Sequence, residues 1–253
     1  MQQGAQIANL TESDVSLIKP TYHHNGKYRR AILLFHGFYS TPAVYRKLVP
    51  ALTNYDAISC PVLPGHAESI AAFAKTKAAD WFLCAEQACA QLIREFDQVE
   101  VMGLSLGGIL AAHLANHYKL SHLYLLAPAF DLRLPINITL GLTRILQKLR
   151  FSAVRSLGTN LYTKQVADIV YKKIPLAAIT EILNLCQQVH FSLPQCPTEL
   201  FLGCHDAVVA SERVAQRFHN LANVNIHWLK HSAHVLPLDG DIKTIIDSID
   251  APS

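Results

Sequence analysis

Short, unbroken runs of apolar residues recur along the chain, separated by longer segments whose apolar positions repeat at helical spacing. Such runs are typical of strands that are buried on both faces of a parallel sheet. The pattern predicts strands at residues 31–35, 57–62, 100–104, 122–127, 199–202 and 224–229. Because strands alternate with helical segments, we expect an α/β fold with a doubly wound, mostly parallel sheet and right-handed crossovers.

Helices are expected in the segments between these strands. Pro42 suits a first helical turn, so a helix is predicted over 42–52. Asp80 is a suitable N-cap for a helix at 81–96, and a third helix is predicted at 106–118. These helices would supply crossovers between the parallel strands.

The alternation breaks between residues 131 and 195, where the pattern indicates helices and connecting loops but no strand. We interpret this segment as a helical cap inserted into the fold. The α/β core would then consist of residues 1–130 and 196–253. Near the N-terminus, residues 15–18 are expected to add a short edge strand.

Composition narrows the class of protein. The 253 residues are 51% hydrophobic and only 16% charged, which suits one large α/β domain with a modest insertion. The formal charge is +3 and no run of five Lys or Arg residues occurs, so no nucleic-acid partner is expected. The N-terminal residues lack a basic segment followed by an apolar run, which predicts a cytoplasmic protein without a secretory signal.

Two further features of the composition affect this picture. An uncharged stretch at 101–118 imitates a membrane span, but its three glycines divide it better into a strand, a tight turn and a helix. The six cysteines lack the spacing of a metal site, and we expect them to be buried free thiols. No metal or organic cofactor is expected, and the sequence makes no prediction of the oligomeric state.

The strongest chemical signal is the segment Gly103-Leu104-Ser105-Leu106-Gly107, which lies between a predicted strand and a predicted helix. A serine on such a turn has a strained backbone and needs small neighbours, which Gly103 and Gly107 provide. A plain turn between a strand and a helix is the alternative, but this position favours a nucleophile elbow. We therefore predict that Ser105 is a catalytic nucleophile.

A serine hydroxyl is a weak nucleophile, so it requires a histidine base that is oriented by a carboxylate. In a parallel sheet such groups are expected in loops after the carboxyl ends of strands. Asp206 follows the strand at 199–202, and His234 lies between the last strand and the last predicted helix. We predict that Asp206 and His234 are the partners of Ser105.

Other residues compete for these two roles. His231 is only three residues from His234, and Asp131 also follows a strand end, so both remain alternatives. His219, on a predicted helix, and His227, inside a strand, are expected to be surface or packing residues.

Catalysis would also require backbone amides that stabilise the oxyanion of a tetrahedral intermediate. The amide of Leu106 opens a helix, whose dipole favours negative charge. The amide of Phe38 follows His36-Gly37, directly after the first predicted strand. We predict that these two amides form the oxyanion hole; the alternative is that His36-Gly37 serves only to end the strand.

These motifs resemble those of the α/β-hydrolase superfamily in content and in the order Ser, Asp, His. The resemblance covers nearly the whole chain, and within the superfamily it is to small carboxylesterases and monoacylglycerol lipases. It implies a catalytic triad of Ser105, Asp206 and His234, with the amides of Phe38 and Leu106 as the oxyanion hole. The matching segments are H-G-F at 36–38, P-G-H at 64–66, G-L-S-L-G-G at 103–108, H-D at 205–206 and S-A-H-V at 232–235.

Two segments depart from the superfamily pattern: Ala67-Glu68-Ser69 stands where relatives commonly have another glycine, and 131–195 matches no motif. The cap roofs the substrate pocket in this superfamily, so the resemblance leaves the substrate open. The expected function is hydrolysis of a small carboxylic ester, short- to medium-chain or monoacylglycerol-like, through an acyl-enzyme on Ser105. Alternatives are thioester or carbon-carbon bond hydrolysis by the same triad, and a catalytically silent binding protein.

The segment 131–195 also differs from the rest of the chain in charge. It holds eight basic and three acidic residues, a net formal charge of +5, interleaved with aliphatic side chains. A basic amphipathic segment of this type suits weak contact with an anionic membrane surface. The alternative is an ordinary solvated helix face over a packed core.

Overall fold

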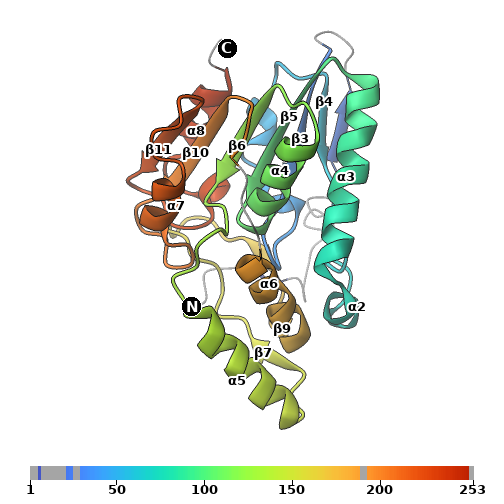
Figure 1. Ribbon diagram of the computed structural model, residues 1–253, viewed down its shortest axis with the longest axis vertical. Helices are drawn as coiled ribbons and strands as arrows, with labels where there is room; N and C mark the ends of the chain where they lie inside the picture. Colours follow the sequence, from blue (N-terminus) through green and yellow to red (C-terminus); the bar gives the residue numbers. More distant parts are fainter. Residues whose placement is uncertain (1–4, 7–20, 25–28, 189–192, 251–253) are drawn as a thin grey trace.

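The computed structural model describes residues 5–6, 21–24, 29–188 and 193–250. At its centre is a seven-stranded sheet in which every neighbouring pair is parallel except β2 with β4 (Figure 1). The predicted α/β class with a mostly parallel sheet is therefore confirmed. The strands lie in the order β11 (Val224–Leu229), β10 (Thr198–Gly203), β6 (His122–Leu126), β5 (Gln98–Leu104), β3 (Arg30–Phe35), β4 (Ala57–Cys60) and β2 (Thr21–His24).

Helices and turns cover both faces of this sheet. One face packs against α3 (Ala78–Glu95), α4 (Leu106–His117) and α7 (Ser211–Arg217). The other face packs against α8 (Ile242–Asp250) and three short 3-10 segments, namely η2 (Pro42–Tyr45), η3 (Val49–Ala51) and η4 (Leu236–Leu238).

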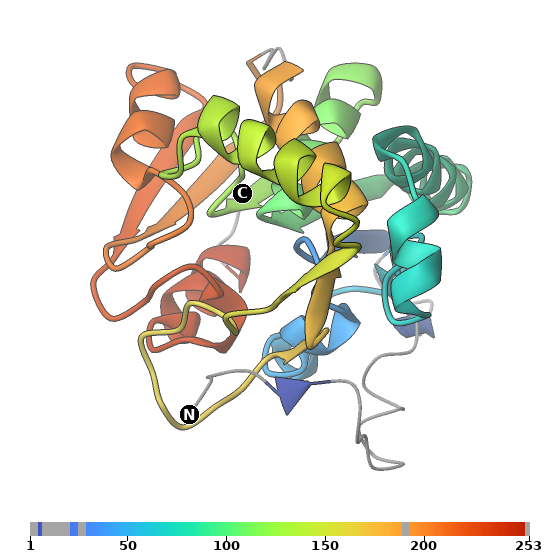
Figure 2. The same cartoon turned by 90° about the horizontal axis from the view of Figure 1, so that it is seen from below.

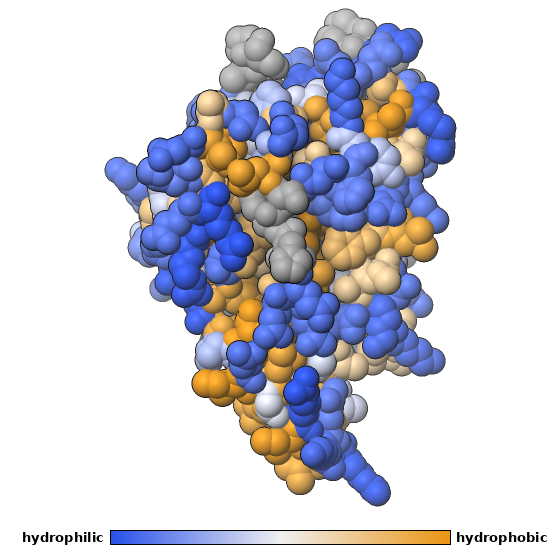
Figure 3. Space-filling model, in the orientation of Figure 1, coloured by the Kyte–Doolittle hydropathy of each residue, from blue (hydrophilic) through white to orange (hydrophobic). Residues whose placement is uncertain are grey.

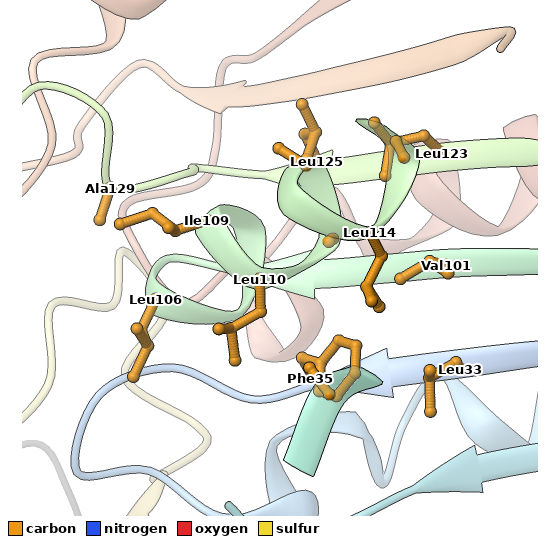
Figure 4. Close-up of a cluster of buried hydrophobic side chains, with 14 of the residues drawn as sticks. Leu33, Phe35, Val101, Leu106, Ile109, Leu110, Leu114, Leu123, Leu125 and Ala129 are labelled. Carbon is orange, nitrogen blue, oxygen red and sulfur yellow. The ribbon is translucent and has the colours of Figure 1, made fainter. Parts of the chain in front are cut away.

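The central strands are mostly apolar because both of their faces are buried. In β3, Leu33 and Phe35 belong to the hydrophobic core beneath α4, whereas the intervening residue Leu34 belongs to the core on the opposite face. Figure 4 shows Leu110 and Leu114 of α4 pointing toward Phe35 and Val101 of the strands. Successive side chains of a strand alternate between faces, so in a doubly covered sheet a polar residue needs a partner, as Glu100 of β5 has in Arg30 and Tyr55.

The helix predicted over 42–52 is wrong, because this stretch forms the two separate turns η2 and η3. Pro50 lies inside η3 and has no backbone N–H. Its ring would also clash with the carbonyl of Arg46 in a continuous α-helix. The prolines at 42 and 50 therefore allow a short turn each but not one helix between them.

The boundary predicted for α3 is also wrong by one turn. The helix begins at Ala78, with Lys77 as its N-cap. Asp80 lies within the first turn, and its carboxylate accepts a hydrogen bond of 2.8 Å from the Lys77 N–H. Asp80 thus satisfies an amide at the helix start from inside the helix, as the acidic member of a capping box does.

Three further differences concern short elements. The strand predicted at 57–62 ends at Cys60, because Pro61 cannot continue the hydrogen-bond ladder. An unpredicted helix, α2 (Ile70–Lys75), has Ser69 as its N-cap, whose hydroxyl accepts a hydrogen bond from the Ala72 N–H. The edge strand beside β4 is β2 (Thr21–His24), whereas the predicted edge strand at 15–18 lies outside the described residues.

The segment 131–195, called the cap below, contains short strands as well as helices, so the expectation that it has no strand is wrong. These strands are two or three residues long and depend on distant partners, which a local pattern cannot reveal. The helices α5 and α6 pack against each other, as Figure 2 shows. The cap elements are α5 (Ile136–Lys148), β7 (Ala153–Arg155), β8 (Ile169–Val170), β9 (Lys173–Pro175) and α6 (Leu176–Gln188), with β7 paired to β9 and β8 to β1 (Ala5–Gln6).

The stretch at 101–118 divides into β5 and α4 on either side of Ser105, as expected. Among the described helices none is long and apolar enough to cross a bilayer. All six cysteines are free, but only four are buried: Cys84 is half-buried and Cys204 is exposed. Cys204 directly follows β10 in a loop, so the expectation of burial is wrong there.

Candidate active site

Ser105 occupies a one-residue turn between β5 and α4. Its backbone angles are φ 56° and ψ −111°, in a region that side chains other than glycine rarely adopt. The turn is crowded on both sides, because a Cβ at Gly103 would lie 2.0 Å from the carbonyl oxygen of Gly107. A Cβ at Gly107 would lie 2.1 Å from the carbonyl oxygen of Phe35. Both glycines are therefore required if the strained serine is to sit at the end of the strand.

Replacing Gly103 with alanine is expected to destabilise the fold by about 3 kcal/mol or more, because the clash is with backbone atoms that cannot move aside. Gly141 in α5 is a matched control, since no atom lies within 4 Å of the position of an added Cβ. Gly141→Ala should instead stabilise the helix by roughly 0.5–1 kcal/mol. Chemical denaturation of the two variants measures both changes; equal effects would contradict the packing argument.

The structure brings His234 and Asp206 together from different loops. The Nδ1 of His234 lies 2.8 Å from Oδ2 of Asp206. The other carboxylate oxygen accepts hydrogen bonds from the amides of Val208 (2.7 Å) and Val209 (2.8 Å). Burial alone would raise the pKa of the Asp206 carboxyl, but the charge and hydrogen bond of His234 and these two amides hold the pKa below its usual value. An ionised Asp206 requires the proton of a neutral His234 to be on Nδ1, which leaves Nε2 as a proton acceptor.

Ser105 and His234 are both almost fully buried, and both line the same cavity. Among the described hydrogen bonds none joins the Ser105 hydroxyl to the His234 ring. Hydrogen bonds between a nucleophile and its base often shorten only when substrate binds. The structure therefore brings Ser105 and the hydrogen-bonded pair of His234 and Asp206 to one cavity, as the sequence predicted; their catalytic roles stay predictions.

The rival residues are engaged elsewhere. His231 is exposed, and its Nδ1 pairs with Asp241 at 3.3 Å. Asp131 forms ion pairs with Arg217 (2.5 Å) and Arg213 (3.8 Å). Of the two histidines expected to be packing or surface residues, His219 is exposed and His227 pairs with Glu199 on the sheet.

The loop that follows β3 lies directly against Ser105. A Cβ at Gly37 would be 3.4 Å from the Cβ of Ser105. The Phe38 amide is thus one residue beyond this contact in the loop after β3, and the Leu106 amide directly follows Ser105 at the end of β5. Neither amide donates to a protein acceptor among the hydrogen bonds of the described residues, as an oxyanion hole would require; that role stays a prediction.

Two buried histidines set the shape of this loop. The ring of His36 accepts a hydrogen bond from the Leu63 N–H (3.1 Å), and the ring of His66 accepts one from the Tyr39 N–H (3.2 Å). Each ring donates its other N–H to a backbone carbonyl, that of Gly37 or Pro64. Burial lowers the pKa of His36 to about 4 and that of His66 well below its usual value, so both remain neutral. His36 is thus more than a residue that ends a strand.

A cavity of about 540 Å³ opens above Ser105, between the sheet and the cap. Most of its wall is apolar. The aliphatic side chains that line it come from both parts of the chain, namely Leu104, Leu132, Leu134, Leu157, Val170, Ile179, Ile182, Leu183, Val208 and Val235. Such a wall suits the hydrocarbon part of a ligand.

An acidic side chain of the cap, Asp168, lines this cavity. Asp168 is buried, and its carboxylate accepts hydrogen bonds from the Ser40 hydroxyl (2.9 Å) and the Ile169 N–H (2.8 Å). Burial raises the pKa of Asp168 to about 6. Each carboxylate oxygen can accept a second hydrogen bond, so Asp168 and Ser40 form a polar spot in an apolar pocket.

The cap is fastened to the loops of both Asp206 and His234. The carbonyl of Asn160 accepts hydrogen bonds from the N–H groups of His234 (3.0 Å) and Val235 (3.2 Å). The side-chain oxygen of Asn160 accepts another from the Ala207 N–H (2.8 Å). A single cap residue thereby connects the loop of the carboxylate with the loop of the imidazole.

Asp168 and Asn160 were not among the candidates from the sequence. Neither follows a predicted strand of the sheet, and both lie in a segment without a recognisable motif. The available signal was an acidic residue within an apolar stretch, at 167–171. That pattern alone does not distinguish a pocket residue from an ion pair inside the cap.

Comparisons with known proteins agree with this geometry. The family model described as "Alpha/beta hydrolase family" matches residues 32–242. The chain is 29% identical over 239 residues to the thermostable monoacylglycerol lipase of Bacillus sp. (strain H-257), covering 90% of this chain and 91% of that protein.

Solved structures show the same fold at lower identity. One belongs to the metagenome-derived lipolytic enzymes LipS and LipT; its TM-score is 0.78 at 22% identity, covering 92% of this chain and 96% of that one. Another is a soluble variant of monoglyceride lipase from Saccharomyces cerevisiae, with a TM-score of 0.69 at 15% identity, covering 91% of this chain and 89% of that one. Because the family model spans most of the sheet, the elbow at Ser105 and the loop of Asp206, the chain belongs to the alpha/beta hydrolase family.

Proposed function

We propose that this protein is a serine hydrolase that cleaves small carboxylic esters of the monoacylglycerol type. The observation that carries the proposal is the cavity, whose wall contains Ser105 and His234 together with long aliphatic surfaces and one polar spot. A lipase- or esterase-type hydrolase also agrees with the relatives described above.

The proposed reaction has two steps. The Ser105 hydroxyl attacks the ester carbonyl carbon while Nε2 of His234 takes its proton and passes it to the departing alcohol. Water then attacks the acyl-enzyme, His234 takes the proton of that water, and the acid leaves as Ser105 regains its hydrogen. The ionised Asp206 stabilises the imidazolium that forms twice, and the amides of Phe38 and Leu106 stabilise the two oxyanions.

The size and polarity of the cavity support a small, amphipathic ester. A volume of about 540 Å³ falls within the range of small-molecule sites, roughly 300–1,000 Å³. The aliphatic wall suits one acyl chain, and the Asp168–Ser40 spot suits an alcohol part with free hydroxyl groups. A triacylglycerol has three acyl chains and no free hydroxyl, so it matches neither feature.

Hydrolysis assays with glycerides of one medium acyl length test this proposal. We expect the monoacylglycerol to have the highest kcat/KM, above the diacylglycerol and far above the triacylglycerol. The thioester of the same acid tests whether the oxygen ester is preferred. Equal rates for mono- and triacylglycerol would refute the proposed substrate.

The variant Asp168→Leu tests the polar spot separately. Loss of a hydrogen bond to a charged group should raise KM for the monoacylglycerol about 10- to 100-fold. The p-nitrophenyl ester of the same acid has no glycerol hydroxyls, so its kinetics should change little. A similar loss on both substrates would mean that Asp168 acts only through the structure of the cap.

A further inference from the structure

The outer face of α5 is apolar and unusually exposed. Ile138, Leu142, Ile145 and Leu149 recur at intervals of three and four residues, which places them on one side of the helix. Ile138 is 71% exposed and the other three are each more than half exposed. The opposite side of the helix, with Leu140, faces the protein. Figure 3 shows apolar atoms gathered at the lower end of the molecule, where α5 lies in Figure 1.

This apolar surface reaches the entrance of the catalytic cavity. Leu134, which precedes α5, and Leu157, which is 91% exposed, are both surface residues and both line the cavity. Phe151, just after α5, is also more than half exposed. A partner that binds this apolar surface would therefore lie next to the entrance through which a substrate reaches the cavity.

Basic side chains accompany the apolar face. Arg144 and Lys148 lie one turn apart on the flank of α5, and Arg155 and Lys173 are partners in the register of β7 and β9. All four side chains are exposed, and none forms an ion pair with an acidic residue in the described ranges. These four positive charges are therefore available to a negatively charged partner.

We propose that α5 and its basic flank dock on an anionic lipid surface, from which the ester substrate enters the cavity. The apolar face would lie among the acyl chains, and the basic side chains would meet anionic headgroups, as in amphipathic interfacial helices. The inference rests on the proposed function, because a water-insoluble ester is found at such a surface. The continuity of the apolar face with the cavity entrance favours this occupant over a protein partner.

Flotation with vesicles tests the surface without any turnover. The Ser105→Ala protein is mixed with vesicles of phosphatidylcholine alone, or with vesicles of equal amounts of phosphatidylcholine and phosphatidylserine. We expect binding to the anionic vesicles to be about tenfold tighter, and to weaken as salt is added. No binding to either vesicle would overturn the proposal.

Paired variants, made in the same Ser105→Ala protein, identify the surface. Ile138→Ser with Leu142→Ser should weaken binding to the anionic vesicles about tenfold or more. The matched control is Leu83→Ser with Ile93→Ser, which changes two exposed aliphatic residues of α3, a helix outside the cap. The control should bind as the parent does, and thermal unfolding should show both double variants folded. Equal weakening by the two double variants would overturn the assignment to α5.

Charge and self-association are tested in the same way. Arg144→Gln with Lys148→Gln should remove much of the preference for anionic vesicles while leaving the apolar face intact.

Sedimentation equilibrium that reveals a dimer broken by the Ile138 and Leu142 changes would assign the face to a second copy and overturn the proposal. If the protein hydrolyses soluble esters but binds no vesicle, the docking proposal is refuted and the proposed function stands. If it binds vesicles but hydrolyses no ester, the proposed function is refuted and the docking surface stands.

Discussion

Ser105→Ala is expected to lower kcat for ester hydrolysis by about 10⁵-fold or more, because removal of a triad nucleophile alone costs nearly as much as removal of the whole triad. The assay is hydrolysis of p-nitrophenyl esters of graded acyl length. The fold should be unaffected, since alanine keeps the Cβ that the strained turn already accommodates at φ 56°. Unfolding free energy should change by no more than about 0.5 kcal/mol.

Two comparisons make this result specific to Ser105. Ser248→Ala on α8 removes a serine hydroxyl that donates to the carbonyl of Thr244, and should leave activity unchanged. A phosphonate ester should label the wild-type protein once, with loss of its leaving group, and should not label Ser105→Ala. Equal esterase rates for wild type and Ser105→Ala would favour the silent binding protein over the enzyme.

The fold was predictable because its information is local. Each central strand is dominated by apolar residues, as at 31–35 or 123–127, and both faces of each strand are buried in the structure. The predictions that were wrong concern elements that depend on more than the local apolar pattern. Pro50 breaks a segment whose apolar pattern resembles a helix, and β7 and β9 exist only because they pair with each other.

In the candidate site, too, some residues could be predicted from the sequence and others could not. Ser105, Asp206 and His234 follow strand ends, and the parallel topology carries strand ends to one edge of the sheet, so their proximity could be expected. Their catalytic roles stay predictions. Asp168 and Asn160 lie at the cavity because of the way the cap folds over the sheet. The hydrophobic pattern of 131–195 does not predict that arrangement.

The choice between Asp206 and Asp131 as the carboxylate partner can be made by experiment. In Asp206→Asn the amide oxygen still accepts from Val208 and Val209, so the loop should keep its shape. The new NH₂ group, however, would donate to Nδ1 of His234 and drive the ring proton to Nε2. With Nε2 protonated, the ring cannot take the proton of Ser105.

We therefore expect Asp206→Asn to lower kcat by about 10⁴-fold while the protein remains folded. Asp131→Asn should change kcat only a few-fold and stability by no more than about 1 kcal/mol, because Asp131 pairs with arginines at the surface. A large loss from Asp131→Asn together with near-normal activity of Asp206→Asn would reverse the assignment.

Since the depressed pKa keeps Asp206 ionised, its stabilising effect on the fold is present at neutral pH and is lost as pH falls through that pKa. Asp206→Asn should therefore flatten the decline in stability at acid pH, a change that Asp131→Asn, at a solvent-screened site, should not reproduce.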